Sequence, residues 1–140
     1  MKQKYNIRPI KVEDYTILTK WWKSYDGIQI PDSSILPNGG LGGFVIEKKE
    51  KMIAAAYIYF TNSAIAYIDF LISDPNYKGK DRYEIIAQLI VSCSDAAVKQ
   101  GYKLVWAMTK YNGIIQRCKE LGGDILDDKY TVIYTHKINS

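Results

Sequence analysis

Residues 67–90 read YIDFLISDPNYKGKDRYEIIAQLI and predict a strand, a short basic turn and a helix, in that order. The strand residues alternate between two faces of a sheet, with Ile68, Phe70 and Ile72 on one face and Tyr67, Asp69 and Leu71 on the other. Because these residues are mostly apolar, we expect a largely buried strand. The turn residues Asp74-Pro75-Asn76 then end it.

The helix is expected to begin near Lys80 or Asp81, and apolar residues recur after it at helical spacing. The expected packed stripe consists of Ile85, Ile86, Leu89, Ile90, Cys93, Ala96 and Ala97. Backbone N–H groups in a first helical turn have no partner within the helix, and the helix dipole adds partial positive charge there. Together with Lys78, Lys80 and Arg82, this helix start predicts a bound phosphate or pyrophosphate.

The composition is typical of one globular domain. The chain has 140 residues, of which 47% are apolar and 24% charged. No apolar run approaches the ~18 residues that span a bilayer, and the N-terminal MKQKYNIRPI has no signal-peptide core, so we expect a cytoplasmic protein without a membrane partner. The net charge of +4 suits an acidic ligand but is too small to favour nucleic acid.

The cysteines and the single histidine do not favour metal or Cys–His chemistry. Cys93 and Cys118 both fall on expected helices, where we expect reduced thiols, and His136 lies near the C-terminus. Since none of the three has the spacing of a zinc ligand set, no metal site is expected.

The chain as a whole predicts the order β-α-loop-β-β-β-α-β-α-β. The expected strands are 5–9, 43–47, 52–60, 63–73, 103–108 and 130–137, and the expected helices are 13–25, 80–101 and 114–121. The strand at 103–108 is expected to be buried. Residues 26–43 are rich in glycine and proline and are expected to form a functional loop, whereas the charged run 47–51 is expected to be a solvated hairpin turn.

These features together resemble the GNAT-type N-acyltransferases, which transfer an acyl group from coenzyme A to an amine. Residues 74–83, Asp-Pro-Asn-Tyr-Lys-Gly-Lys-Asp-Arg-Tyr, are similar to the family's Asp-Pro-x-Tyr-Arg-Gly-Lys-Gly-x-Gly loop around the coenzyme A pyrophosphate. Ile7-Arg8-Pro9 followed by Glu13-Asp14 also looks like the family's first strand and helix. The resemblance implies one α/β domain of the α+β kind over residues 1–140, with a mixed, mostly antiparallel sheet of about six to seven strands and about four helices.

The turn departs from the family pattern at Asp81 and Tyr83, which replace two glycines. A carboxylate at Asp81 would repel a pyrophosphate unless it turns away, and the residue types favour a capping box in which Asp81 and Glu84 bond the helix start. Arg82 is a candidate for restoring a positive contact to phosphate. A Lys-Asp-Arg turn also resembles short GNAT-like proteins carried by bacteriophages, which would act in the host cytoplasm.

The resemblance implies acetyl-CoA as co-substrate. Its pantetheine arm and thioester oxygen would bind backbone groups of Leu71, Ile72 and Ser73, where the family's strand splays from its neighbour and leaves free N–H and C=O groups. The full set of further candidates for binding coenzyme A is Lys78, Gly79, Lys80, Asp81, Arg82, Tyr83 and Asn112.

Catalytic candidates also follow from the resemblance. Asp69 lies where GNAT-like proteins often hold an acid that binds or deprotonates the acceptor amine, and a solvent-facing strand carboxylate is an equal alternative. Cys118 stands where the family has its general-acid tyrosine, but a cysteine at a helix position favours the core over catalysis. Tyr111 and Tyr83 are alternative proton donors.

Acceptor recognition would fall to residues 26–43 together with Trp21, Trp22 and Tyr25. Two adjacent tryptophans on one helix are not expected to face the core together, so one of them is a candidate to line a pocket or an oligomer contact such as a homodimer interface, although partial burial is the more common outcome. The implied reaction is direct transfer of an acyl group to a primary amine of a small molecule or protein. The alternatives are a coenzyme A-binding sensor or host-protein inhibitor without transfer, and a protein-interaction or virion-associated module.

Overall fold

The computed structural model describes residues 4–25, 29–107 and 112–124. In these residues five strands form one sheet in the order β1-β2-β3-β4-β5. The strands are β1 (Asn6–Pro9), β2 (Gly43–Lys48), β3 (Lys51–Phe60), β4 (Ile65–Ser73) and β5 (Leu104–Ala107). Neighbours pair antiparallel as far as β4, and β4 pairs with β5 in parallel, so the expected mixed, mostly antiparallel sheet is confirmed.

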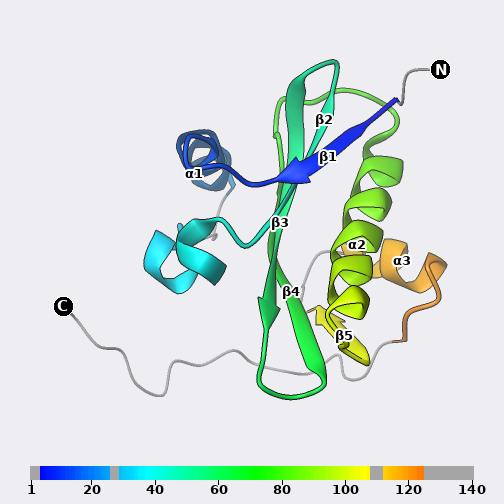
Figure 1. Cartoon of the computed structure of the whole chain (residues 1–140). Coiled ribbons are helices and arrows are strands. Elements are labelled where there is room, and N and C mark those ends of the chain that lie inside the picture. The colour runs from blue at the N-terminus through cyan, green and yellow to red at the C-terminus, as the bar shows by residue number, and fades with distance from the viewer. Residues whose placement is uncertain (1–3, 26–28, 108–111, 125–140) are drawn as a thin grey trace.

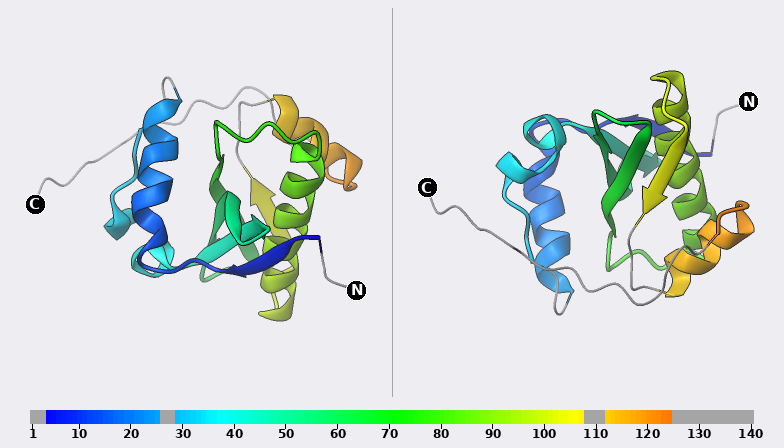
Figure 2. Two further views of the ribbon diagram at one scale, coloured as in Figure 1. Left: turned by 90° about the horizontal axis from the view of Figure 1, so that it is seen from above. Right: turned by 90° about the horizontal axis from the view of Figure 1, so that it is seen from below.

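Helices cover both faces of this sheet (Figures 1 and 2). One face carries α1 (Asp14–Ser24) with the 3-10 helices η1 (Ser33–Ile35) and η2 (Pro37–Gly40), and the other carries α2 (Arg82–Lys99) and α3 (Asn112–Glu120). The described residues thus hold five strands and three α-helices, and the expected strand 130–137 lies outside them. No described helix has the length and apolar character needed to cross a membrane.

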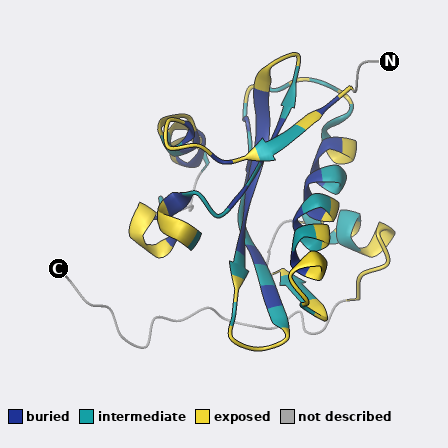
Figure 3. Ribbon diagram, in the orientation of Figure 1, coloured by how far each residue is buried: buried dark blue, intermediate teal, exposed yellow. Residues whose placement is uncertain are grey.

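Each face of the sheet has its own apolar core, visible as the dark blue residues between the layers in Figure 3. The core towards α2 includes Ile46, Ile58, Ile68, Ile85, Leu89 and Cys93. The core towards α1 includes Leu18, Trp21, Trp22, Val45, Tyr57 and Ile72. The apolar stripe expected on α2 is therefore confirmed as its packed side.

β4 contains a bulge that strict alternation did not predict. Phe70 has a φ of 51°, in the left-handed region, and the β3–β4 register shifts between Ala55 and Tyr57. As a result, Phe70 and Ile72 pack towards α1, while Leu71 packs towards α2. The expected assignment of faces is therefore wrong from Phe70 onward, because the bulge moves each later side chain to the opposite face.

The β2–β3 turn and the strand β5 differ in how well the sequence predicted them. Lys49 and Glu50 form the β2–β3 turn, and their φ values of 52° and 64° are typical of a two-residue type I′ hairpin, as expected for this run. The strand at 103–108 was expected to be buried, but Leu104 is 46% exposed. That expectation is wrong because β5 lies at the edge of the described sheet and pairs only with β4 there.

Candidate functional site

Among the described residues, the parallel ladder between β4 and β5 covers the first half of β4. It runs from the pair Ile65 and Leu104 to the pair Ile68 and Ala107. In the stretch 69–73, Asp69, Ile72 and Ser73 pair with β3, and the bulge residues Phe70 and Leu71 have no cross-strand partner in the described part of the chain. The backbone expected to hold the pantetheine arm, 71–73, belongs to this stretch.

Asp69 lies at the start of this stretch, opposite Tyr57 of β3 and therefore on the face towards α1. Its Oδ1 accepts a hydrogen bond from the Phe70 N–H at 2.7 Å. Burial raises the pKa of the Asp69 carboxyl, and this hydrogen bond offsets only part of the rise. Burial, followed by the charge of Asp69, raises the pKa of Tyr59 to about 12. Asp69 is thus a half-buried acid that binds a proton more tightly than an ordinary aspartate.

Aromatic rings lie on the same face as Asp69. Tyr57 is its cross-strand partner, and Tyr59 pairs with Tyr67, two residues from Asp69. Tyr67 also meets Trp106 of β5 edge-on, with ring centroids 5.5 Å apart. The Nε1 of Trp106 is buried without a hydrogen-bond partner in the described part of the chain. An acid flanked by aromatic faces is an arrangement that attracts organic cations.

Arg82 fastens the turn that follows β4. Its Nη1 donates a hydrogen bond to Ser73 Oγ at 2.6 Å, and its Nη2 donates to the carbonyl groups of Tyr77 at 2.6 Å and Asp74 at 3.2 Å. The guanidinium therefore ties the two ends of the turn together. Arg82 thus has a role inside the turn, and its candidate contact with phosphate stays a prediction.

The middle of the turn offers positive groups. The backbone N–H groups of Lys78, Gly79 and Lys80 have no hydrogen-bond acceptor among the described residues. The side chains of Lys78 and Lys80 are exposed and form no ion pair there. α2 begins two residues later, at Arg82, and its dipole adds to these groups. The arrangement suits an anion, and the anion itself stays a prediction.

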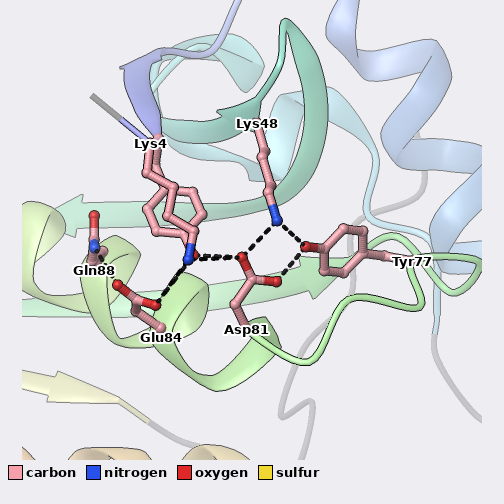
Figure 4. Close-up of polar contacts among 7 residues, drawn as sticks. Lys4, Lys48, Tyr77, Asp81, Glu84 and Gln88 are labelled. Atoms are coloured by element: carbon pink, nitrogen blue, oxygen red, sulfur yellow. Dashed lines mark hydrogen bonds and ion pairs between the residues drawn. The ribbon is translucent and has the colours of Figure 1, made fainter. Parts of the chain in front are cut away.

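Asp81 does not cap α2. Its Oδ2 accepts hydrogen bonds from Tyr5 Oη at 2.5 Å and Lys48 Nζ at 2.9 Å, and its Oδ1 accepts one from Tyr77 Oη (Figure 4). These bonds hold the pKa of the Asp81 carboxyl well below its usual range. The capping box expected between Asp81 and Glu84 is therefore wrong, because donors outside the helix take the carboxylate.

Sequence reasoning missed both distant donors to Asp81. Tyr5 and Lys48 lie 76 and 33 residues before it, so no local pattern connects them. Lys48 belongs to the run 47–51 that was expected to be solvated, and Glu47 also pairs with Arg8 Nε at 3.3 Å. That expectation therefore holds only for the exposed residues 49–51. The available signal was an aspartate at a glycine position, since a buried carboxylate needs donors.

Asp14 forms a second buried cluster at the start of α1. Arg8 donates to both of its carboxylate oxygens, at 2.7 and 3.1 Å, and the Lys11 N–H donates to Oδ2 at 2.7 Å. Burial by itself would raise the pKa of Asp14, but the hydrogen bonds from Arg8 and Lys11 and the charge of Arg8 together lower it below its usual value. Asp14 therefore stays ionised although it is only 4% exposed.

Both tryptophans of α1 are buried. Trp21 is 6% exposed and Trp22 is 1% exposed, and Trp22 meets the rings of Tyr15 and Phe70 edge-on. The expectation that the two tryptophans do not both face the core is therefore wrong. The reason is that Ile30 and Leu36, which precede and follow η1, pack into the same core. Trp22 is a core residue rather than an acceptor contact.

The other two acceptor candidates retain some access. Trp21 lines a hollow of about 420 Å³ between α1 and the β2–β3 hairpin, together with Met52 and Asp74. Tyr25 donates its hydroxyl hydrogen to the Ser73 carbonyl at 2.9 Å, which joins the end of α1 to the end of β4. Tyr25 thus contacts the end of the strand that carries Asp69, and Trp22 contacts the same strand through Phe70.

The remaining candidates belong to α3 or pack against it. Tyr83 lies beneath the Arg117 guanidinium, 4.8 Å from its ring centroid, and Asn112 is exposed at the start of α3. Cys118 is half-buried against the core towards α2, across the sheet from Asp69, and burial raises its pKa. Tyr111 lies outside the described residues. No described His, Cys, Asp and Glu residues form a group that could hold a metal ion.

Solved structures similar to this chain include acetyltransferases. An aminoglycoside acetyltransferase from an uncultured soil metagenomic sample has a TM-score of 0.60 at 16% identity, covering 97% of both chains. The ribosomal-protein-S18-alanine N-acetyltransferase of Escherichia coli has a TM-score of 0.65 at 16% identity, covering 84% of this chain and 76% of its own. A predicted acetyltransferase of Clostridium acetobutylicum, solved with acetyl-CoA, has a TM-score of 0.61 at 17% identity, covering 94% and 99%.

Sequence comparison adds no relative to these structures. No protein-family model matches the chain, and no curated protein matches it. At such low identity the structural likeness establishes the fold, which is GNAT-like, and says nothing about the acceptor.

Proposed function

We propose that this protein is an N-acyltransferase that moves an acyl group, most simply acetyl, from coenzyme A directly to a primary amine. The observation that carries the proposal is the half-buried carboxylate of Asp69, which directly follows the last described pair of β4 with β5. A strand edge with unpaired backbone groups can hold a thioester, and an acid of raised pKa can take a proton from an ammonium group. The GNAT-like fold supports the same reaction.

Coenzyme A would extend from this strand edge to the turn after β4. Its pantetheine arm would pair with backbone groups of Leu71, Ile72 and Ser73, and its pyrophosphate with the N–H groups of residues 78–80 and the lysines there. The residues fit an acidic ligand, because Asp81, the only carboxylate within the turn's 77–81 segment, is already bonded to Tyr5, Tyr77 and Lys48. Tyr83 and Asn112 are further candidates to contact the nucleotide.

In the proposed transfer the amine nitrogen attacks the thioester carbonyl carbon, a tetrahedral oxyanion forms, and the carbon–sulfur bond breaks. Asp69 would bind the ammonium form and take its proton, directly or through a water. Backbone N–H groups of β4 would stabilise the oxyanion. The thiolate that leaves needs a proton, for which Tyr111, Cys118 and Tyr83 are the candidate donors.

The acceptor would be an amine that carries positive charge in solution, either a small molecule or a side chain or terminus of a protein. The rings of Tyr59 and Tyr67 support this class, since aromatic rings attract cations and Asp69 supplies the opposite charge. Trp21 and Tyr25 would border the acceptor from α1, and Trp22 would support them from the core.

The test is the release of free thiol from acetyl-CoA in the presence of polyamines, aminoglycosides and lysine peptides. Asp69→Asn should slow release about hundredfold while leaving coenzyme A affinity unchanged, because the acid acts on the amine. The wild-type rate should fall as the pH drops through the pKa of Asp69, which lies above the ordinary 3.8. Asp95→Asn, an exposed acid on α2, is the matched control.

Three outcomes distinguish the alternatives. Thiol release that Asp69→Asn leaves unchanged would remove Asp69 from the mechanism. A rise in melting temperature with coenzyme A but no release from any acceptor would favour a ligand-binding protein without transfer. No rise at millimolar coenzyme A or acetyl-CoA would exclude both and favour a protein-interaction module.

A further inference from the structure

Side chains from three parts of the chain bond to Asp81, in the turn that is proposed to bind coenzyme A. Figure 4 shows Lys48 from the β2–β3 hairpin and Tyr77 from the turn converging on this carboxylate. Tyr5, which is 6% exposed, reaches it from beside β1. Lys48 Nζ also lies 3.2 Å from Tyr77 Oη, so the donors contact one another as well as the acid. One carboxylate thus connects β1, the hairpin and the turn.

Tyr77 folds back over Gly79 to reach Asp81. A Cβ added at Gly79 would lie 2.1 Å from Tyr77 Oη and 2.7 Å from Asp81 Oδ1. Since these distances are far below van der Waals contact, only glycine leaves room for the ring. The φ of Gly79 lies outside the left-handed region, so the reason for glycine is space rather than backbone conformation. The glycine of this turn therefore serves the Tyr77–Asp81 bond.

The charges of the cluster balance without using the lysines of the turn. Lys48 lies 2.9 Å from Asp81, and Lys4 lies 3.7 Å from both Asp81 and Glu84. Two positive and two negative groups therefore offset one another, and the positive charge of residues 78 and 80 remains for a ligand. The carboxylate of Asp81, which was expected to repel a pyrophosphate, is thus neutralised by Lys48 and Lys4.

We propose that Asp81 is a positioning residue, which holds residues 77–81 in the shape that presents the N–H groups of residues 78–80 to an anion. Tyr5, Lys48 and Tyr77 are the other parts of this anchor. Its consequence is that Asp81→Gly, which makes the turn more like the Gly-x-Gly pattern, weakens the binding of coenzyme A. The identity of the anion rests on the proposed function, whereas the anchoring of the turn does not.

The first test measures the affinity for coenzyme A by isothermal titration. Asp81→Gly should weaken it about tenfold, because losing charge-assisted hydrogen bonds frees the turn. Asp81→Asn, which retains a side-chain acceptor but not the charge, should fall between wild type and glycine. Asp95→Asn on the exposed side of α2 is the control and should bind as wild type. Equal or tighter binding by Asp81→Gly would overturn the proposal.

The second test needs no ligand. Lys78 is exposed in the turn and the bond that follows it joins Lys78 to Gly79, which the variants leave unchanged, so limited trypsin cleavage after Lys78 reports how well the turn is held. Asp81→Gly and Lys48→Met should each speed this cleavage severalfold, and the double variant should exceed the faster single variant only slightly, since both break one anchor. Cleavage at the wild-type rate in both single variants would overturn the proposal.

The outcomes separate this inference from the acyltransferase proposal. Weaker coenzyme A binding by Asp81→Gly without thiol release by the wild type would support the anchor and reject transfer. Thiol release with Asp81→Gly equal to wild type in binding and cleavage would support transfer and reject the anchor. If the wild type binds no coenzyme A, the assignment of the anion is wrong, and the cleavage assay still decides the anchor.

Discussion

The two longest helices of the described chain each begin beside a mostly buried acid, and the two acids act in opposite ways. Asp14 accepts hydrogen bonds from Arg8 and from the backbone of Lys11, all close to it in sequence. Asp81 accepts them from side chains as distant as Tyr5, and none from the N–H groups of residues 78–80. The first acid fastens the segment that precedes its helix, whereas the second is bonded by distant side chains and leaves the N–H groups of residues 78–80 open. The origin of the donors therefore decides whether such an acid serves stability or binding.

The largest expected effect comes from removing the acid at the start of α1. Asp14→Ala should lower the free energy of unfolding by about 2–3 kcal/mol, because it leaves the largely buried Arg8 without its bidentate partner. Urea denaturation followed by tryptophan fluorescence measures this. Glu13→Ala, at the exposed position before Asp14, is the control and should change stability little. A loss equal to that of the control would mean that the Arg8 pair adds nothing to the fold.

A smaller loss of stability, together with weaker binding, should follow from adding a methyl group to the turn before α2. Gly79→Ala forces the Tyr77 ring away from Asp81, which should cost about 1–2 kcal/mol in unfolding free energy and weaken coenzyme A binding. Gly113→Ala is the matched control, since a Cβ there would meet Tyr83 at an ordinary 3.5 Å. Unchanged stability and binding in Gly79→Ala would show that the Tyr77–Asp81 contact does not hold the turn.

Acid should weaken both helix starts in the same pH range. The pKa values of Asp14 and Asp81 are both lowered by folding, so their contributions are fully present above the unfolded value of 3.8 and are lost as the pH falls below it. The melting temperature should therefore be steady between about pH 7 and 5 and fall below about pH 4. Asp81→Asn should make that fall shallower, and an unchanged slope would contradict the lowered pKa.

The smallest effect distinguishes the contribution of net charge around Asp81 from that of a close hydrogen bond to it. Lys4 is 57% exposed and 3.7 Å from the carboxylate, so Lys4→Ala should change the unfolding free energy by less than about 0.5 kcal/mol. Lys48→Met should destabilise the chain more, because Lys48 is less exposed and donates a hydrogen bond at 2.9 Å. Equal effects in urea denaturation would show that net charge alone holds the cluster.

Much of the fold could be predicted from the sequence because it depends on local patterns. The apolar spacing from Ile85 to Ala97 predicted the packed side of α2, and the turn residues after Ser73 predicted the end of β4. The strands at 43–47 and 52–60 were predicted to within one residue at each end.

The errors came from contacts between distant segments. The bulge at Phe70 depends on the register with β3, and the burial of both tryptophans depends on the cover that Leu36 and its neighbours give to α1. The partners of Asp81 lie on other elements altogether. The sequence therefore singled out the turn as a candidate site, while the hydrogen-bond partners of Asp81 and Arg82 could be identified only from the folded chain.

The contacts among Tyr5, Lys48, Tyr77 and Asp81 predict that these positions depend on one another in evolution. An aspartate at position 81 needs the hydroxyl groups at positions 5 and 77 and the lysine at position 48 as hydrogen-bond donors. A glycine at position 81 has no side chain that needs these donors. Among relatives these columns should therefore change together, as positions in contact do. A change between aspartate and glycine at position 81 would pass through intermediates in which the turn is held less firmly. We therefore expect the chains with aspartate at this position to form one clade rather than to arise repeatedly.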